Sequence, residues 1–142
     1  MKLMGRKDGF SLIELLIVVA IIGIIATIAV PQLLDAIDRA RQRSTMADMR
    51  NISTANGTYL VDDGAYASAL SDLVPDYMQV VPSNDSWGNA LDYSVTSGDY
   101  VLQSYGSDGA DGPAAPTPWI NGPYDVDLEM TNGQFTQAPS AQ

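Results

Sequence analysis

The first third of the chain is dominated by one unbroken apolar run. Between Phe10 and Leu34, a stretch of 25 residues, Glu14 is the only charged side chain. A helix needs about 20 apolar residues to span the hydrocarbon core of a bilayer. The run therefore predicts a membrane-spanning helix. The basic residues Lys2, Arg6 and Lys7 before it predict a cytoplasmic N-terminus, with the rest of the chain on the other side of the membrane.

Beyond Pro31 the continuous apolar pattern becomes amphipathic. One stripe of small or apolar residues recurs at helical spacing, and a second stripe is better placed to pack under a globular head. The first consists of Leu34, Ile37, Ala40, Ser44 and Ala47, and the second begins with Met46, Met49, Ile52 and Tyr59. We expect one helix from about Phe10 to about Asn56, kinked or loosened at Pro31 and ended by Asn56-Gly57.

The chain from residue 58 onward alternates short apolar runs with turn residues. This pattern predicts a short helix near residues 68–74 and then a small antiparallel sheet. The expected strands are residues 91–95, 99–103 and 127–130 and a short piece at 134–136, with turns at Thr96-Ser97-Gly98 and Asn132-Gly133. The predicted fold class is α+β, with a long N-terminal helix packed on a small C-terminal antiparallel sheet.

Composition narrows the possible chemistry. The chain has no cysteine and no histidine, which excludes disulfides, Cys/His zinc sites and a Ser-His-Asp triad. All seven Lys and Arg residues lie at or before Arg50, and twelve acidic residues follow it. Such a head disfavours nucleic-acid binding. Its self-repulsion favours high salt, a basic partner or divalent cations, although a solvated acidic surface that needs no ligand explains it equally well.

The start of the apolar run carries a motif. Residues 9–16 read GFSLIELL, after a short basic segment. This junction resembles the prepilin leader and cleavage motif of type IV pilins and type II secretion pseudopilins. The resemblance implies that a prepilin peptidase and methyltransferase cuts between Gly9 and Phe10 and methylates the new Phe10 amine. It divides the chain into a cleaved leader (1–9), a transmembrane and assembly helix (10–34), an amphipathic helix (35–57) and a pilin-like head (58–142), together a type IV pilin fold.

Glu14 needs compensation inside a membrane. A charged side chain at the bilayer centre costs about 2.5–3.5 kcal/mol on insertion scales. Cleavage after Gly9 would create a positive amine at Phe10, four residues away on the same helical face. The resemblance implies that Glu14 meets the Phe10 amine of a neighbouring subunit as a filament grows. The alternative is a carboxylate that reaches the membrane surface on its own.

Three stretches extend the resemblance into the head: VVPSNDSWGN (80–89), DYVLQSYGSDG (99–109) and YDVDLEMTNGQF (124–135). The first two resemble the major pseudopilin, although Ser86 stands where that family has proline before Trp87. The resemblance implies a Ca²⁺ ion held by Asp108, Asp125 and Asp127. Calcium takes six to eight oxygen ligands, so Asp111 could contribute, but simple turns would explain the same Asp-Gly pairs. Trp87 is expected to anchor a loop rather than to bind a ligand.

The resemblance implies a structural subunit and not an enzyme. It points to the major pseudopilin of a type II secretion system, a homopolymer anchored in the inner membrane that drives export of folded proteins. Its expected partners are the inner-membrane assembly platform and minor pseudopilins, and its head is periplasmic. The alternatives are the major pilin of a type IV pilus and a minor pilin acting as a binding module. The arginines near the membrane either meet acidic heads of neighbouring subunits or are solvated: Arg39, Arg41, Arg43 and Arg50.

Overall fold

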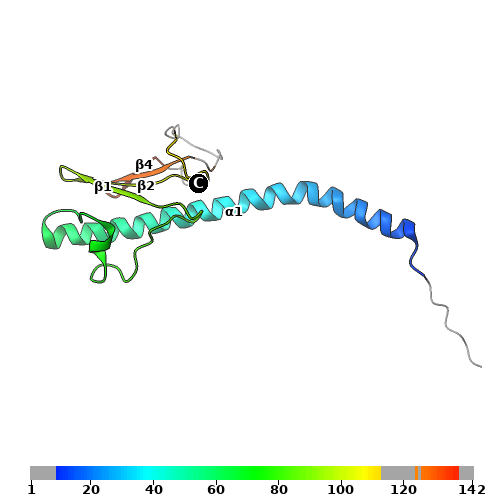
Figure 1. Ribbon diagram of the computed structural model, residues 1–142, viewed down its shortest axis with the longest axis horizontal. Helices are drawn as coiled ribbons and strands as arrows, with labels where there is room; N and C mark the ends of the chain where they lie inside the picture. Colours follow the sequence, from blue (N-terminus) through cyan, green and yellow to red (C-terminus); the bar gives the residue numbers. More distant parts are fainter. Residues whose placement is uncertain (1–8, 113–123, 125, 138–142) are drawn as a thin grey trace, which may run out of the picture. The chain divides into compact units, whose positions relative to one another are not determined.

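The computed structural model describes residues 9–112, 124 and 126–137 (Figure 1). It contains one long helix, a short 3-10 helix and four strands. Their bounds are α1 (Leu12–Asp63), η1 (Leu70–Leu73), β1 (Asp92–Thr96), β2 (Asp99–Ser104), β3 (Leu128–Thr131) and β4 (Gln134–Gln137). The chain divides into two compact units, one up to Ile37 and one from Asp38 onward, which are described separately.

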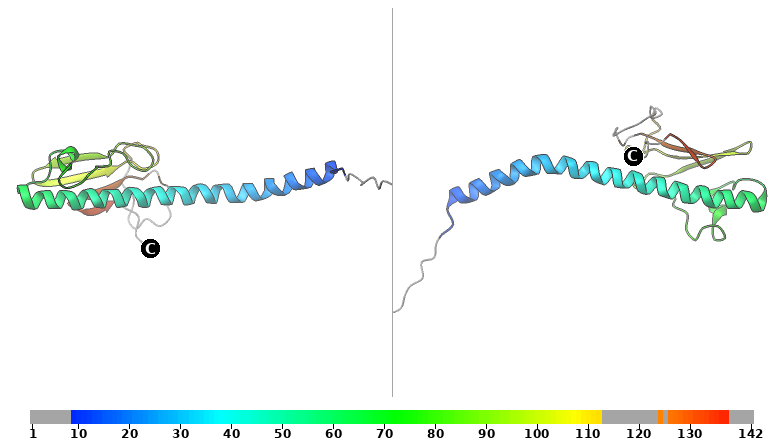
Figure 2. Two further views of the ribbon diagram at one scale, coloured as in Figure 1. Left: turned by 90° about the horizontal axis from the view of Figure 1, so that it is seen from below. Right: turned by 180° about the vertical axis from the view of Figure 1, so that it is seen from behind.

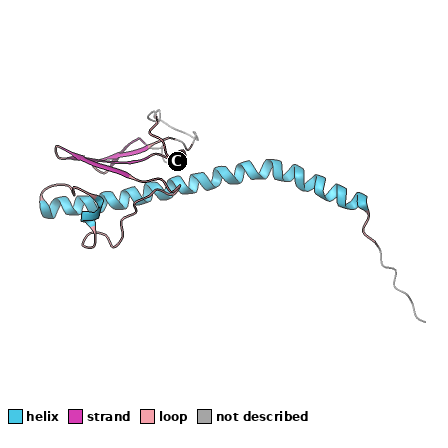
Figure 3. Ribbon diagram, in the orientation of Figure 1, coloured by secondary structure: helices cyan, strands magenta, loops and turns pink. Residues whose placement is uncertain are grey.

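The first unit is the N-terminal part of α1. Its Ile, Val and Leu side chains are exposed, and none of its most apolar 18-residue window is buried within the protein. The helix is long and apolar enough to cross a membrane. Pro31 lies inside α1 without ending it. Figure 3 shows α1 as one unbroken helix. The predicted long helix through the apolar run is therefore confirmed.

The helix does not end at Asn56-Gly57, so this prediction is wrong. Asn56 is fully buried in α1, and its side chain is a polar anchor for the chain that follows the helix. Its Oδ1 accepts a hydrogen bond from the Ala67 N–H (3.0 Å), and its Nδ2 donates to the Tyr93 hydroxyl (2.9 Å). The helix stops seven residues later, where Gly64 adopts a positive φ of 77° that favours glycine.

The four strands form one antiparallel sheet in the order β1-β2-β3-β4. Each predicted strand is present within one or two residues of its expected bounds. Both predicted hairpin turns are present as well, with consecutive positive φ angles at Ser97 (53°) and Gly98 (97°) and at Asn132 (49°) and Gly133 (82°). Two such residues in a row match the right-handed twist of the flanking strands.

The core of the head lies between the sheet and the C-terminal half of α1 (Figure 2). Alternate residues of β2 point inward, as the strand period requires. The largest buried side chains from the two layers are Met49 and Ile52 of α1, Tyr100 and Leu102 of β2, and Leu128 and Met130 of β3. The second helical stripe therefore packs under the head as predicted, and the small residues of the first stripe, Ala40, Ser44 and Ala47, are exposed.

Candidate functional site

The motif of residues 9–16 spans the start of α1. Ser11 precedes the first helical residue, and its backbone N–H donates a hydrogen bond to Oε2 of Glu14 (2.9 Å). This is one half of a capping box, in which a glutamate in the first helical turn satisfies an N–H that the helix itself cannot pair. Glu14 therefore has a partner in its own chain before any neighbouring subunit arrives. The Ser-x-x-Glu spacing before an apolar run signals this role, which the sequence analysis missed.

The residues on either side of the predicted cleavage bond are exposed. Phe10 is 76% exposed. A side chain at Gly9 would meet no atom within 4 Å, and Gly9 has no positive φ. The fold of this chain therefore places no demand on glycine at position 9. Cleavage, methylation and pairing of Glu14 with a neighbouring amine stay predictions.

Asp127 of the predicted calcium site is deeply buried, with 2% of its surface exposed. Its Oδ2 accepts hydrogen bonds from Nε2 of Gln103 (3.1 Å) and from the Gly112 N–H (3.2 Å). Its Oδ1 is buried and has no hydrogen-bond partner among the residues that the structure describes. Burial raises the pKa of Asp127, and the negative charges of Asp111 and Asp108 act in the same direction, while the hydrogen bonds from Gly112 and Gln103 offset part of the rise.

Asp108, another predicted ligand, is on the loop of residues 105–112, which we call the acidic loop. Asp108 is exposed there, and its Oδ1 accepts a hydrogen bond from the Ala110 N–H (3.2 Å), as in a turn. Asp125 lies outside the described residues. No group of three or more acidic side chains within the described ranges is arranged to hold a metal. Even so, the unpaired buried oxygen of Asp127 is a suitable ligand for a hard cation such as Ca²⁺.

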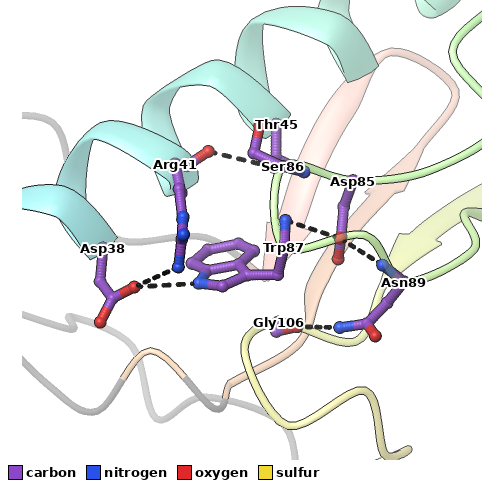
Figure 4. A network of polar contacts seen from close by, with 8 residues as sticks. All are labelled: Asp38, Arg41, Thr45, Asp85, Ser86, Trp87, Asn89 and Gly106. Atoms are coloured by element: carbon purple, nitrogen blue, oxygen red, sulfur yellow. Dashed lines mark hydrogen bonds and ion pairs between the residues drawn. The ribbon is translucent and has the colours of Figure 1, made fainter.

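A second loop, residues 83–90, is folded around the buried carboxylate of Asp85 (Figure 4), and we call it the Trp87 loop. Oδ1 of Asp85 accepts hydrogen bonds from the backbone N–H groups of Trp87 (3.0 Å) and Asn89 (2.8 Å). Its Oδ2 accepts one from the Ser104 hydroxyl (2.8 Å). Hydrogen bonds to an ionised acceptor are stronger than neutral ones, so this carboxylate fixes the backbone of the loop.

The Trp87 loop is attached to α1 through two contacts. The indole N–H of Trp87 donates to Oδ1 of Asp38 (3.2 Å), which also lies 3.4 Å from Nη1 of Arg41 (Figure 4). The Ser86 N–H donates to the hydroxyl of the buried Thr45 (3.1 Å). These contacts confirm that Trp87 anchors a loop. Ser86, which replaces the proline of the family pattern, makes the second contact possible, because proline has no N–H to donate to Thr45.

Two further arginines have partners in their own chain. Nε of Arg39 donates to the Tyr124 hydroxyl (3.1 Å), and the guanidinium of Arg50 lies 5.3 Å from the centre of the Phe135 ring. A cation over an aromatic face at this distance is attracted to the ring. Arg39 and Arg50 therefore help to hold the head on its helix. Contacts of the four arginines with the acidic heads of neighbouring subunits stay a prediction.

Comparison with known proteins agrees with the motif. Residues 4–30 match the family model of the prokaryotic N-terminal methylation motif. The chain is 33% identical over 126 residues to the type II secretion system core protein G of Pseudomonas aeruginosa, an alignment that covers 75% of this chain and 88% of the relative. The chain belongs to the family of type IV pilins and type II secretion pseudopilins.

Other members of this pilin and pseudopilin family match over still more of the chain. Core protein G of Vibrio cholerae is 30% identical over 136 residues, covering 81% of this chain and 92% of the relative. The type IV wide pilus major component PilA4 of Thermus thermophilus is also 30% identical over 136 residues. That alignment covers 96% of this chain and 100% of the relative. No solved structure gives a significant match.

Proposed function

We propose that this chain is the major pseudopilin of a type II secretion system. The observation that carries the proposal is the match to core protein G of several bacteria over most of both chains, together with the cleavage motif in front of an exposed apolar helix. The relatives are named as secretion core proteins and pilus components. The chain therefore acts as a structural subunit of a filament and not as an enzyme.

The proposed assembly begins with processing at the membrane. A prepilin peptidase removes residues 1–9, and the apolar part of α1 stays in the inner membrane with the head in the periplasm. Subunits then join through identical heterologous contacts, which give an open helical filament because they do not close into a ring. The assembly platform of the inner membrane and minor pseudopilins are the proposed partners, and the filament drives export of folded proteins.

The major pilin of a surface type IV pilus is the second candidate, because PilA4 aligns over its entire length with this chain. Protease protection separates the two. For a periplasmic pseudopilus, protease added to intact cells leaves the head uncut, and cleavage begins only when the outer membrane is opened. Loss of the assembled protein from intact cells would instead show a surface pilus.

We also propose that the head binds Ca²⁺ through Asp127, Asp108 and Asp125, with Asp111 nearby. The unpaired buried Oδ1 of Asp127 supports this proposal. A bound cation would supply the partner that this oxygen lacks and would offset the repulsion from Asp108 and Asp111. Loop carboxylates together with backbone carbonyls are the usual ligands of such a site.

Calcium is expected to stabilise the full chain in detergent micelles. At a free concentration of 100 times the dissociation constant, the free energy of unfolding should rise by about 2.7 kcal/mol, and Asp127→Asn should abolish most of this gain. Without calcium, the free energy of unfolding of the wild type should fall relative to that of Asp127→Asn as the pH rises. The reason is that the folded chain, whose Asp127 pKa is raised, holds that proton longer than the unfolded chain.

Thermal melts with calcium and with chelator measure both effects. Glu129→Gln serves as the control, because it removes a carboxylate of the head that is outside the predicted ligand set. Calcium should stabilise this variant as much as it stabilises the wild type. Equal stability of the wild type with calcium and with chelator would contradict the proposed site.

A further inference from the structure

We propose that Asn89 couples the calcium site to the Trp87 loop, so that calcium binding at Asp127 strengthens the attachment of that loop to α1. The inference rests on the calcium site proposed above and gives a role to residues outside its ligand set. Coupling of this kind is reciprocal. Calcium should hold the Trp87 loop more firmly in place, and an intact contact at Asn89 should raise the affinity for calcium by the same factor.

The contact between the two loops is close. Nδ2 of Asn89 donates to the Gly106 carbonyl (2.7 Å; Figure 4). Gly106 is itself buried. A Cβ added at Gly109 would lie 2.7 Å from Oδ1 of Asn89, and Gly109 has a φ of +65°. Real Cβ atoms essentially never approach another atom so closely. The acidic loop therefore closes around the Asn89 amide, and this is possible because residue 109 has no side chain.

The other end of the acidic loop is held by Asp127. The Gly112 N–H and Nε2 of Gln103 both donate to Oδ2 of Asp127, so Oδ1 is the oxygen left for a cation. Asp108 and Asp111 lie on the loop between these two attachments. A cation bound to Oδ1 and to loop oxygens would fix the acidic loop, including the Gly106 carbonyl that Asn89 binds.

The Trp87 loop carries the effect onward to α1. Asp85 binds the backbone N–H groups of both Asn89 and Trp87 with the same oxygen, so these two residues cannot move independently without losing a charged hydrogen bond. Trp87 in turn binds Asp38 of α1 (3.2 Å). The path from Asp127 to α1 is thus a continuous set of hydrogen bonds and one short loop. Ordering the acidic loop by calcium lowers the entropy cost of ordering the Trp87 loop.

The test uses the full chain in detergent micelles with Trp119→Phe, which leaves Trp87 as the only tryptophan. Calcium binding is measured by calorimetry, and the state of the loop by Trp87 fluorescence in the same titration. We expect a saturable change in Trp87 emission that follows the calorimetric curve. Adding Asn89→Ala should weaken calcium binding by about tenfold, within the usual range for coupled sites, and should remove the calcium-dependent emission change.

A second variant covers the case in which Asn89→Ala does not fold. In Gly109→Ala, the new methyl group collides with the Asn89 amide. Gly64→Ala is the control, because it has the same kind of backbone strain (φ +77°) but no atom within 4 Å of its Cβ. Gly109→Ala should lose the coupling, and Gly64→Ala should keep it.

The outcomes separate this inference from the calcium proposal. Absence of calcium binding in the parent chain would overturn the calcium site and the coupling with it. Calcium binding with an unchanged Trp87 signal, or with equal affinity in the Asn89→Ala and parent chains, would overturn the coupling alone.

Discussion

Replacing Glu14 with alanine is expected to leave membrane insertion intact and to abolish filament formation. The carboxylate is costly in a bilayer, by about 2.5–3.5 kcal/mol at its centre, so its removal does not hinder insertion. What is lost is the partner for the Phe10 amine of the next subunit. Fractionation of membranes and electron microscopy of filaments measure the two effects separately.

The capping contact to Ser11 gives Glu14 a second role, and Glu14→Gln separates the two roles. Glutamine in the first turn can still accept the Ser11 N–H bond, because glutamate and glutamine both serve in a capping box. It cannot pair as a charge with an amine. We therefore expect Glu14→Gln to fail in assembly as alanine does. Normal filaments from Glu14→Gln would show that helix capping, and not charge pairing, is what assembly requires.

Glu129→Gln is the matched control for this experiment. Glu129 is the only other glutamate of the chain, lies on β3, and accepts a hydrogen bond from the Thr136 hydroxyl (2.6 Å). The same chemical change there should leave filaments normal. Loss of filaments in this control would mean that removing any carboxylate is enough, which would contradict the account given for Glu14.

Replacing Gly9 with valine is expected to block removal of the leader. Because a side chain at position 9 meets nothing within 4 Å and φ is not positive there, the substitution should not disturb the fold. Any effect then arises in the peptidase that reads this position. Mass spectrometry of the N-terminus should find the full precursor and no methylated Phe10.

Gly57→Val is the control for the Gly9 substitution. Gly57 also has open space around its Cβ position but lies in α1 far from the cleavage bond. That variant should be processed as the wild type is. Complete processing of Gly9→Val would contradict the predicted cleavage position.

Sequence reasoning predicted the elements whose signals are local. The helix follows from an unbroken apolar run, and the hairpins follow from alternation around turns such as Asn132-Gly133. The predicted stop at Asn56-Gly57 failed because its local propensity was overridden by tertiary contacts of Asn56 with Ala67 and Tyr93. Propensity is a weak prior wherever a side chain finds such partners.

The loops of the head could be predicted only in part. Twelve acidic residues follow Arg50, and nothing in the local pattern says that Asp85 and Asp127 become buried. Their burial depends on partners distant in sequence, Ser104 for Asp85 and Gln103 for Asp127. The hydrogen bond of Asn89 to Gly106 was missed for the same reason, because Gly106 lies 17 residues further along the chain.

Deletion of the gene in the cell that encodes it tests the central claim most directly. If the chain is the major pseudopilin, folded proteins destined for secretion should accumulate in the periplasm, while surface pili and the motility they support stay normal. Restoring the wild-type gene should restore secretion, and the Glu14→Ala gene should not. Normal secretion in the deletion strain, together with loss of surface pili, would contradict the proposed function and assign the chain to a type IV pilus.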